Sequence, residues 1–263
     1  MFLEPKKSLG QNFLKSPKVL NDFIQACDLS KNDVVLEVGA GTGAVTRELA
    51  EVAGKVIAVE FDRDLVEALK ESLKDYSNVE IVNDDILQIF PTSLAVGELH
   101  RAGNLKIVGS IPYSITSPLI GKIYELKQKP TLICLIVQWE VAKKICAKPP
   151  NASYLSNLVA TFGEAKIIRK IPPGAFCPAP RVDSAILRIV THNKYPDIRT
   201  KEFSQFLHKG FKHPRKKIKQ VFTLEELLKV GIDPSLRPEN LSLLNWLNLF
   251  NLGVSHLGYS HMR

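Results

Sequence analysis

The sequence has no apolar run long enough to cross a membrane. A transmembrane helix needs about 20 consecutive, mostly apolar residues, and no part of the 263-residue chain approaches that length. The first residues, MFLEPKKSLGQNFL, also lack the long apolar core of a secretory signal. We therefore expect a cytoplasmic protein that does not associate with a membrane.

Cysteine is scarce, and its spacing argues against several kinds of site. No two cysteines form a C-x-x-C pair, so neither a zinc site nor a thiol redox motif is expected. His208 and His213 lie in a basic stretch without neighbouring acids or thiols, so we expect no metal. Reduced thiols in a reducing compartment are expected at Cys27, Cys134, Cys146 and Cys177.

The sequence contains no internal repeat. Its main part alternates between strand-like and helix-like patterns. Short runs rich in Val and Ile predict strands at 33–38, 55–60, 78–83, 105–110 and 131–138. Helical patterns lie between them at 44–53, 62–74 and 117–128. Apolar runs of this kind suit strands covered on both faces, as in a parallel sheet. The alternation predicts an α/β fold with a Rossmann-like sheet.

The end of this region and the segment after it have different patterns. Residues 165–171 and 184–190 are expected to pair as an antiparallel hairpin, joined by a proline-rich connection. Beyond residue 195 the chain has helical periodicity and many basic residues. We predict a catalytic domain over residues 1–195 and a small, basic helical domain over residues 196–263.

Acidic residues are rare in one part of this chain, whose net charge is +8. Residues 201–220 contain seven Lys or Arg and one acid, a net charge of +6, which leaves only +2 for the rest. This asymmetry indicates a polyanionic partner, although charge runs are also common on solvated helix faces. Phe203, Phe206 and Phe211 interleave with the charges, so a folded surface is expected here. The candidate phosphate contacts are Lys212, Arg215, Lys216, Lys217 and Lys219.

A glycine-rich turn follows the first predicted strand of the sheet. In VLEVGAGTGAVT, Gly39, Gly41 and Gly43 separate that strand from a helix, which permits a tight turn and close approach to a ligand. Glu60 ends the next strand, where an acid accepts hydrogen bonds from both ribose hydroxyls of an adenosine. This arrangement predicts a nucleoside cofactor; a plain packing turn is the simpler alternative.

The identity of the cofactor is open at this level. Gly39, Gly41 and Ala44 also satisfy the G-x-G-x-x-A pattern of NAD-binding enzymes. After the third strand come Asp84 and Asp85, which have no obvious task in such an enzyme. In an S-adenosylmethionine site an acid there can hold the adenine amino group. Either aspartate is also suited to cap the following turn.

Ser110, Ile111, Pro112 and Tyr113 follow the fourth strand, at the edge where open α/β sheets bind ligands. An exocyclic amine of a nucleobase is a poor nucleophile, because its lone pair is delocalised into the ring. Two acceptors, the side-chain oxygen of Ser110 and the carbonyl of Ile111, are suited to grip such an amine and aim its lone pair. Pro112 fixes the backbone, and Tyr113 is placed to stack on the base. The alternative is a proline turn with Tyr113 in the core.

Several motifs together resemble the KsgA-type small-subunit rRNA adenine dimethyltransferase family. The resemblance covers nearly the whole chain and rests on long segments. They are KKSLGQNFL (6–14), LEVGAGTG (36–43), VEFDRDL (59–65), IPYSITSPL (111–119), VQWEVAKKI (137–145), FCPAPRVDSA (176–185) and FKHPRKKIK (211–219).

The resemblance implies dimethylation, from S-adenosylmethionine, of N6 in two adjacent adenines near the 3′ end of small-subunit rRNA. It implies cofactor contacts at Asn12, Leu14, Gly39, Glu60, Asp85 and Ser110, to which the glycine turn adds Gly41. The chain departs from the family at one position, because Ser110 stands where Asn is usual. A hydroxyl accepts a hydrogen bond but is shorter than a carboxamide, so a slower second methylation is conceivable.

Three alternatives remain at this point. The first is an Erm-like methyltransferase acting on large-subunit rRNA, which has a similar catalytic motif. The second, suggested by Ser110, is an RNA-binding assembly factor with weakened catalysis. The third, an NAD oxidoreductase, leaves the basic segment and residues 110–113 unexplained. We expect the small-subunit rRNA as partner and a monomeric enzyme.

Overall fold

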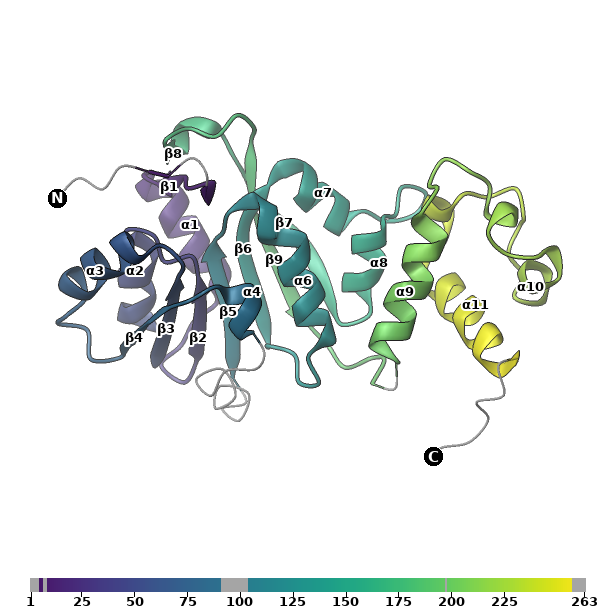
Figure 1. Ribbon diagram of the computed structural model, residues 1–263, viewed down its shortest axis with the longest axis horizontal. Helices are drawn as coiled ribbons and strands as arrows, with labels where there is room; N and C mark the ends of the chain where they lie inside the picture. Colours follow the sequence, from purple (N-terminus) through teal and green to yellow (C-terminus); the bar gives the residue numbers. More distant parts are fainter. Residues whose placement is uncertain (1–4, 7–8, 91–103, 197, 257–263) are drawn as a thin grey trace. The chain divides into compact units, whose positions relative to one another are not determined.

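The computed structural model describes residues 5–6, 9–90, 104–196 and 198–256 (Figure 1). The chain divides into two compact units, one formed by the chain up to Lys143 with Glu164–His192, the other by Lys144–Gly163 with the chain from Asn193. This division lies close to the boundary expected near residue 195. Residues 144–163 differ from expectation and join the second unit, because α8 (Tyr154–Ala160) packs on α9 (Thr200–Phe211).

A seven-stranded sheet with the strand order β4-β3-β2-β5-β6-β9-β7 forms the centre of the first unit. Its five parallel strands are β2 (Val34–Val38), β3 (Lys55–Glu60), β4 (Val79–Asn83), β5 (Leu105–Ser110) and β6 (Leu132–Gln138). β9 (Ser184–Thr191) runs antiparallel to β6, and β7 (Gly163–Ile171) lies next to β9 at the edge. The prediction of a mostly parallel Rossmann-like sheet with an antiparallel end is confirmed.

Helices cover both faces of this sheet because its central strands are apolar on both faces. Alternate residues of β6, Leu132, Cys134 and Ile136, belong to the core that α1 (Pro17–Cys27) and α2 (Ala44–Val52) cover. The intervening residues of β6 are equally buried. In Figure 1 α6 (Thr116–Glu125) lies across the opposite face. α3 (Arg63–Ser72) lies on the same face as α1 and α2, because its Leu69 packs with Ala58 of β3, which points the same way as Val56. The first unit also contains α4 (Ile86–Ile89) and α7 (Trp139–Cys146).

The order of the strands determines where a ligand site can form. From β2 the chain adds β3 and β4 on one side and then returns to add β5 and β6 on the other. At such a switch point the loops after the two central strands diverge and leave a crevice at the carboxyl edge. Gly39 follows β2 and Ser110 ends β5, so both lie at this crevice.

A short two-stranded sheet, which the sequence did not predict, holds the N-terminal segment. β1 (Phe13–Leu14) pairs antiparallel with β8 (Phe176–Cys177), and Phe13 lies opposite Cys177. Lys15 adds a backbone hydrogen bond to the Ala175 carbonyl at 2.9 Å. The 3-10 turn η4 (Pro173–Ala175) precedes β8.

The second unit is helical and has an aromatic core. Besides α8 and α9 it contains α10 (Leu224–Lys229), α11 (Leu243–His256) and the 3-10 turns η5 (Ile218–Gln220) and η6 (Pro238–Asn240). The aromatic rings in mutual contact are Phe203, Phe206, Phe211, Phe222, Trp246 and Phe250. The phenylalanines that interleave with the basic residues therefore anchor that segment to a folded unit.

No helix in the described ranges combines the length and the apolarity of a membrane span. All four cysteines are free thiols, and Cys27 and Cys134 are buried. The described residues also contain no cluster of three or more His, Cys, Asp or Glu side chains arranged to hold a metal ion.

Candidate functional site

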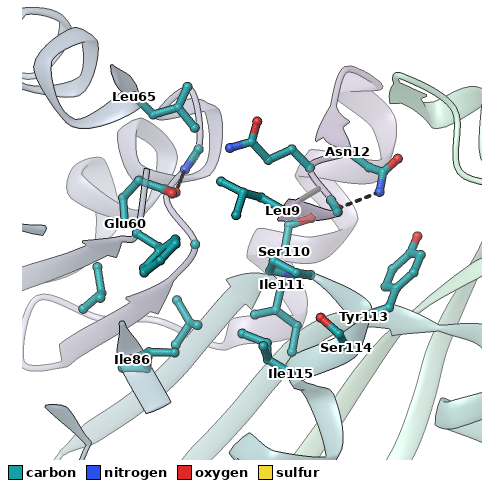
Figure 2. A pocket seen from close by; sticks show the side chains of 18 of the residues that line it. Leu9, Asn12, Glu60, Leu65, Ile86, Ser110, Ile111, Tyr113, Ser114 and Ile115 are labelled. Atoms are coloured by element: carbon teal, nitrogen blue, oxygen red, sulfur yellow. Dashed lines mark hydrogen bonds between the residues drawn. The ribbon is translucent and has the colours of Figure 1, made fainter. Parts of the chain in front are cut away.

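A cavity of about 290 Å³ opens at the carboxyl edge of the parallel strands in the first unit (Figure 2). The N-terminal segment and the residues that follow β2, β3, β4 and β5 form its walls. It brings together all but one of the residues expected to bind the cofactor or the target base. Those that line it are Asn12, Gly39, Gly41, Glu60, Asp85, Ser110, Ile111, Pro112 and Tyr113.

The glycine turn combines a ligand cradle with a packing position. Gly39 and Gly41 line the cavity with φ of 74° and 59°, a backbone region that favours glycine. A Cβ on Gly39 would lie 3.6 Å from the Ser110 carbonyl oxygen, in the space between β2 and β5. Gly43 has a different role, since a Cβ there would lie 2.9 Å from Leu69 Cδ2. The plain packing interpretation therefore holds for Gly43 alone.

Glu60 ends β3 with its carboxylate held in place beside the glycine turn (Figure 2). The Gly41 N–H donates to Glu60 Oε2 at 2.8 Å, and the Asp62 N–H donates to Oε1 at 2.8 Å. Each carboxylate oxygen has a further lone pair. Glu60 is only 7% exposed and lines the cavity, so its carboxylate is oriented before any ligand arrives. This geometry suits an acceptor of two adjacent hydroxyl groups.

Asp84 and Asp85 both line the cavity after β4. Asp85 is also the N-cap of α4, because its Oδ1 accepts the Leu87 N–H at 2.9 Å. Asp84 Oδ1 accepts the Asp85 N–H at 2.7 Å. The capping role and a ligand contact are compatible for Asp85, since a carboxylate has acceptor sites for both.

The segment after β5 presents its polar groups to the cavity. Within the described part of the chain, the hydroxyl of Ser110 has no hydrogen-bond partner, and the residue is only partly buried. Pro112 precedes the 3-10 turn η3 (Tyr113–Ile115), whose last residue donates its N–H to the Pro112 carbonyl at 3.1 Å. Tyr113 is half-buried and lines the cavity, so the alternative of a core tyrosine is wrong.

A hydrogen bond fixes the ring of Tyr113. Its hydroxyl lies 2.5 Å from Ser184 Oγ, at the start of β9. Burial raises the pKa of Tyr113, and the Ser184 hydroxyl partly offsets this effect. The phenol is therefore neutral at physiological pH, and it presents an uncharged ring to the cavity.

The N-terminal segment is tied to the beginning of α3. The ammonium of Lys6 lies 2.6 Å from Asp62 Oδ1 and 2.7 Å from Asp64 Oδ2, and the Gln11 amide donates to Asp62 Oδ2 at 2.8 Å. Burial alone would raise the pKa of Asp62, but the hydrogen bonds from Lys6, Gln11 and the Asp64 N–H lower it overall. These contacts hold Gln11 and its neighbours against the cavity.

Leu14 is the one expected cofactor contact that does not line the cavity. Successive side chains of a strand point to opposite faces, so the side chain of Phe13 faces the cavity and that of Leu14 faces the core. Within the N-terminal motif, Lys7 and Ser8 lie outside the described residues.

Some cavity residues were not identified from the sequence. Phe61, which is 59% exposed, lines the cavity next to Glu60 and offers an aromatic face. The sequence did contain a signal for it: an aromatic residue directly follows the acid expected to bind ribose, where it suits an adenine ring. Phe176 reaches the cavity from β8, far away in the sequence, and only the short two-stranded sheet reveals it.

A second acidic group lies buried beneath the glycine turn. Glu37, in β2, is 1% exposed, and its Oε2 has no hydrogen-bond partner among the described residues. Burial raises its pKa to about 8; the Thr46 hydroxyl opposes this shift and the Glu60 carboxylate adds to it. At neutral pH Glu37 is therefore mainly protonated.

The expected phosphate contacts lie together in the second unit, between α9 and η5. All five of these basic residues are exposed: Lys212, Arg215, Lys216, Lys217 and Lys219. Ile218, between two of them, is fully buried, and its N–H donates to the Leu236 carbonyl at 2.7 Å. A buried apolar anchor thus holds a strongly basic loop on the surface of this unit.

The fold and the site define the class of protein. A mostly parallel sheet with a glycine turn after β2, an acid at the end of β3 and a polar segment after β5 is that of a class I methyltransferase. The family model described as ribosomal RNA adenine dimethylase matches residues 3–253. The chain belongs to this family, whose members use S-adenosylmethionine.

Individual relatives and solved structures agree. The ribosomal RNA small subunit methyltransferase A of Dehalococcoides mccartyi strain CBDB1 is 38% identical over 259 residues, which are 94% of this chain and 88% of that protein. A dimethyladenosine transferase from Plasmodium falciparum superposes with a TM-score of 0.81 at 24% identity, covering 94% of this chain and 98% of that one. The 23S rRNA methyltransferase ErmE superposes with a TM-score of 0.73 at 26% identity, covering 91% of this chain and 98% of that one.

The residues of the cavity fit this cofactor. The Glu60 carboxylate suits ribose hydroxyls, the exposed ring of Phe61 suits an adenine, and the turn at Gly39 leaves a space that a Cβ would fill. The NAD oxidoreductase alternative is wrong, because the family is one of methyltransferases.

Proposed function

We propose that this enzyme transfers methyl groups from S-adenosylmethionine to N6 of two adjacent adenines near the 3′ end of small-subunit rRNA, giving two methyl groups on each. One observation carries the proposal: the cradle at Gly39 and Glu60 and the segment from Ser110 to Tyr113 line a single cavity. The 38% identical relative, named for the small subunit, supports this target.

The bound cofactor supplies an electrophilic methyl group, and the chain positions the amine that attacks it. Ser110 Oγ and the Ile111 carbonyl accept hydrogen bonds from the two N–H groups of the adenine amine. Their pull favours a tetrahedral nitrogen and directs its lone pair away from the ring. The attacking amine becomes cationic and acidic, so no strong general base is needed. Positioning supplies most of the rate enhancement.

The other parts of the chain bind the substrates in this proposal. Tyr113 stacks on the flipped adenine, and Asn12, Gly39, Gly41, Glu60 and Asp85 contact the cofactor. The first unit is the catalytic domain, and the basic loop of the second unit contacts RNA phosphates. The enzyme acts as a monomer, in the cytoplasm, where bacterial ribosomal subunits are assembled.

The test is methyl transfer to unmethylated small ribosomal subunits with isotopically labelled S-adenosylmethionine. We expect label in two adjacent adenines near the 3′ end, with two methyl groups on each by mass measurement. Unlabelled adenine would refute the proposal. Label in large-subunit rRNA alone would favour an Erm-like target, which the similarity to ErmE makes the second candidate.

A third outcome tests the assembly-factor alternative, which the serine at position 110 motivates. Tight subunit binding without methyl transfer at saturating cofactor would support it. A shift of the thermal melting temperature by S-adenosylhomocysteine would then show whether the cofactor site still functions.

A further inference from the structure

A second cavity of about 330 Å³ lies in the first unit, at the carboxyl end of β6, and no step of the proposed reaction uses it. Its walls come from the β6–α7 junction and from the segment before β9. The lining residues are Gln138, Trp139, Glu140, Pro173, Arg181, Val182 and Asp183. The most distinctive of them is a tryptophan.

Two lysine ammonium groups lie close to the indole ring of Trp139, and its backbone is held by a hydrogen bond. The ammonium of Lys143 lies 5.8 Å from its ring centroid and that of Lys170 lies 5.4 Å away. The backbone N–H of Trp139 donates to the Asp183 carbonyl at 2.9 Å, and the residue is only partly buried. A fixed aromatic face next to positive charge is the combination that binds unpaired nucleotides, because bases stack on the ring and phosphates meet the cations.

The cations here are available for phosphate. Lys143 pairs with Glu140 at 2.8 Å and Lys170 with Asp183 at 2.7 Å, with all four side chains at least one-third exposed. Exposed pairs of this kind contribute little to stability, so an RNA phosphate can replace the carboxylate at small cost. Arg181 is exposed and has no ion-pair partner in the described part of the chain.

The second cavity adjoins the first through one residue. Gln138, in the wall of the second cavity, lies directly opposite Ser184 in the antiparallel pairing of β6 and β9. Ser184 in turn binds the hydroxyl of Tyr113, in the wall of the first cavity. We therefore expect an RNA strand whose target base enters the first cavity to carry its next nucleotide toward the second.

We propose that the Trp139 cavity binds the unpaired nucleotide that neighbours the target adenine. The base stacks on Trp139, and Lys143, Lys170 and Arg181 meet the adjoining phosphates. This inference rests on the proposed function and extends it, because it states how the neighbour of the target is held while one adenine reacts.

Tryptophan fluorescence gives a direct readout. The chain has two tryptophans, and Trp246 is fully buried in the second unit, so quenching by a bound base reports on Trp139. The probe is a hairpin RNA with the small-subunit 3′ sequence and both adenines in its loop. We expect strong quenching in the wild type and none in Trp139→Phe, which keeps an aromatic ring and most of the affinity.

Trp139→Ala weakens RNA binding by about 10- to 100-fold and leaves S-adenosylhomocysteine binding unchanged. Ile168→Ala, an exposed apolar position of β7 outside the cavity, is the matched control.

An abasic nucleotide identifies the occupant. Hairpins that lack the base on the 5′ or the 3′ side of the target adenine are titrated against wild type and Trp139→Ala. One of them should bind the wild type about 10- to 100-fold more weakly, without quenching, and bind Trp139→Ala no more weakly than the intact hairpin does. Equal effects in both proteins, or no quenching by any RNA, would overturn the proposal.

The methylation assay separates this inference from the proposed function. If the wild type transfers methyl groups but RNA does not quench its fluorescence, the Trp139 proposal is wrong and the proposed reaction is still supported. Quenching that the abasic hairpin abolishes, without transfer to adenine, supports the Trp139 site as an RNA contact and removes the reaction.

Discussion

The hydroxyl of Tyr113 lies 2.5 Å from Oγ of Ser184, although 71 positions separate the two residues in the sequence. Ser184 is fully buried at the start of β9, whereas Tyr113 lies in the wall of the cavity. The antiparallel insertion of β9 next to β6 brings them together. A buried serine thus fixes the orientation of the ring that we assign to the target base.

Removing this hydrogen bond should slow the reaction without weakening cofactor binding. A neutral hydrogen bond contributes about 1 kcal/mol, so Ser184→Ala and Tyr113→Phe should each lower kcat about 5-fold, with an unchanged Kd for S-adenosylhomocysteine. The double variant should lose no more than either single variant, because both remove the same contact. If the two losses multiply, the hydrogen bond does not orient the ring.

The hydroxyl of Ser110 should matter more for turnover than for cofactor binding. Its hydrogen bond is to an amine that gains positive charge, and such bonds contribute about 1.5–3 kcal/mol. Ser110→Ala should therefore lower kcat about 10- to 100-fold, while calorimetry finds little change in S-adenosylhomocysteine affinity. Ser110→Asn, with the longer carboxamide usual in the family, should raise the fraction of dimethylated over monomethylated adenine in a mass measurement. An unchanged rate in Ser110→Ala would remove this side chain from the mechanism.

Glu37 should give the protein a pH-dependent stability that a glutamine removes. Its pKa rises from the ordinary value of 4.5 to about 8 in the folded state. Between these values the unfolded chain loses this proton and the folded chain keeps it, so folding becomes less favourable as pH rises, by about 1.4 kcal/mol per pH unit. The loss of this contribution to the free energy of unfolding begins above pH 4.5 and is complete above pH 8.

Denaturant unfolding at several pH values checks this. The free energy of unfolding of Glu37→Gln relative to wild type should increase by about 3–4 kcal/mol between pH 5 and pH 8. Glu80→Gln, at an exposed position paired with Lys55, is the control and should show no comparable trend. A Glu37→Gln difference that stays constant with pH would mean that the carboxyl is ionised in the folded protein.

The central strands of the sheet were predictable from sequence because they are buried on both faces. Short runs rich in Val and Ile mark them, with bounds within about a residue of those observed, as in β3 and β5. The site residues at the strand ends follow from the same pattern, since the carboxyl ends of parallel strands meet at one edge. Glu60 and Ser110 are the examples.

The features of the fold and the site that the sequence did not predict depend on contacts between distant segments. The two residues of β1 have no periodicity of their own, so only pairing with β8 tells that Phe13 rather than Leu14 faces the cavity. The partnership of Tyr113 with Ser184 depends on β9 lying between β6 and β7, out of sequence order. Trp139 is likewise one aromatic among many until the ammonium groups of Lys143 and Lys170 are seen close to its ring.

Gly210 should resist substitution by alanine although it lies inside α9. A Cβ there would lie 2.4 Å from Cη2 of Trp246, so the buried indole of α11 has to move. Overpacking costs about 1–3 kcal/mol, which outweighs the gain of up to about 1 kcal/mol from the higher helix propensity of alanine. Gly121→Ala in α6 is a matched control, because in the described part of the chain the added Cβ would meet no atom within 4 Å beyond its own stretch of helix. Thermal unfolding should show a lower Tm for Gly210→Ala and an unchanged or higher Tm for Gly121→Ala. A stabilised Gly210→Ala would mean that Trp246 shifts without cost.

The basic loop should account for part of the salt dependence of RNA binding. Lys216 and Lys217 are exposed and have no acidic residue beside them in the sequence. They directly precede the buried anchor Ile218. Each phosphate contact contributes close to one to the slope of log Kd against log salt, so reversing both charges should lower that slope by about 2. The same reversal at Lys70 and Lys74, exposed on and just after α3, changes the net charge equally and is the control. Titrations of unmethylated small subunits over a range of salt concentrations measure both slopes. If the loop variant and the control have the same slope, the loop contributes only through net charge and does not contact the RNA.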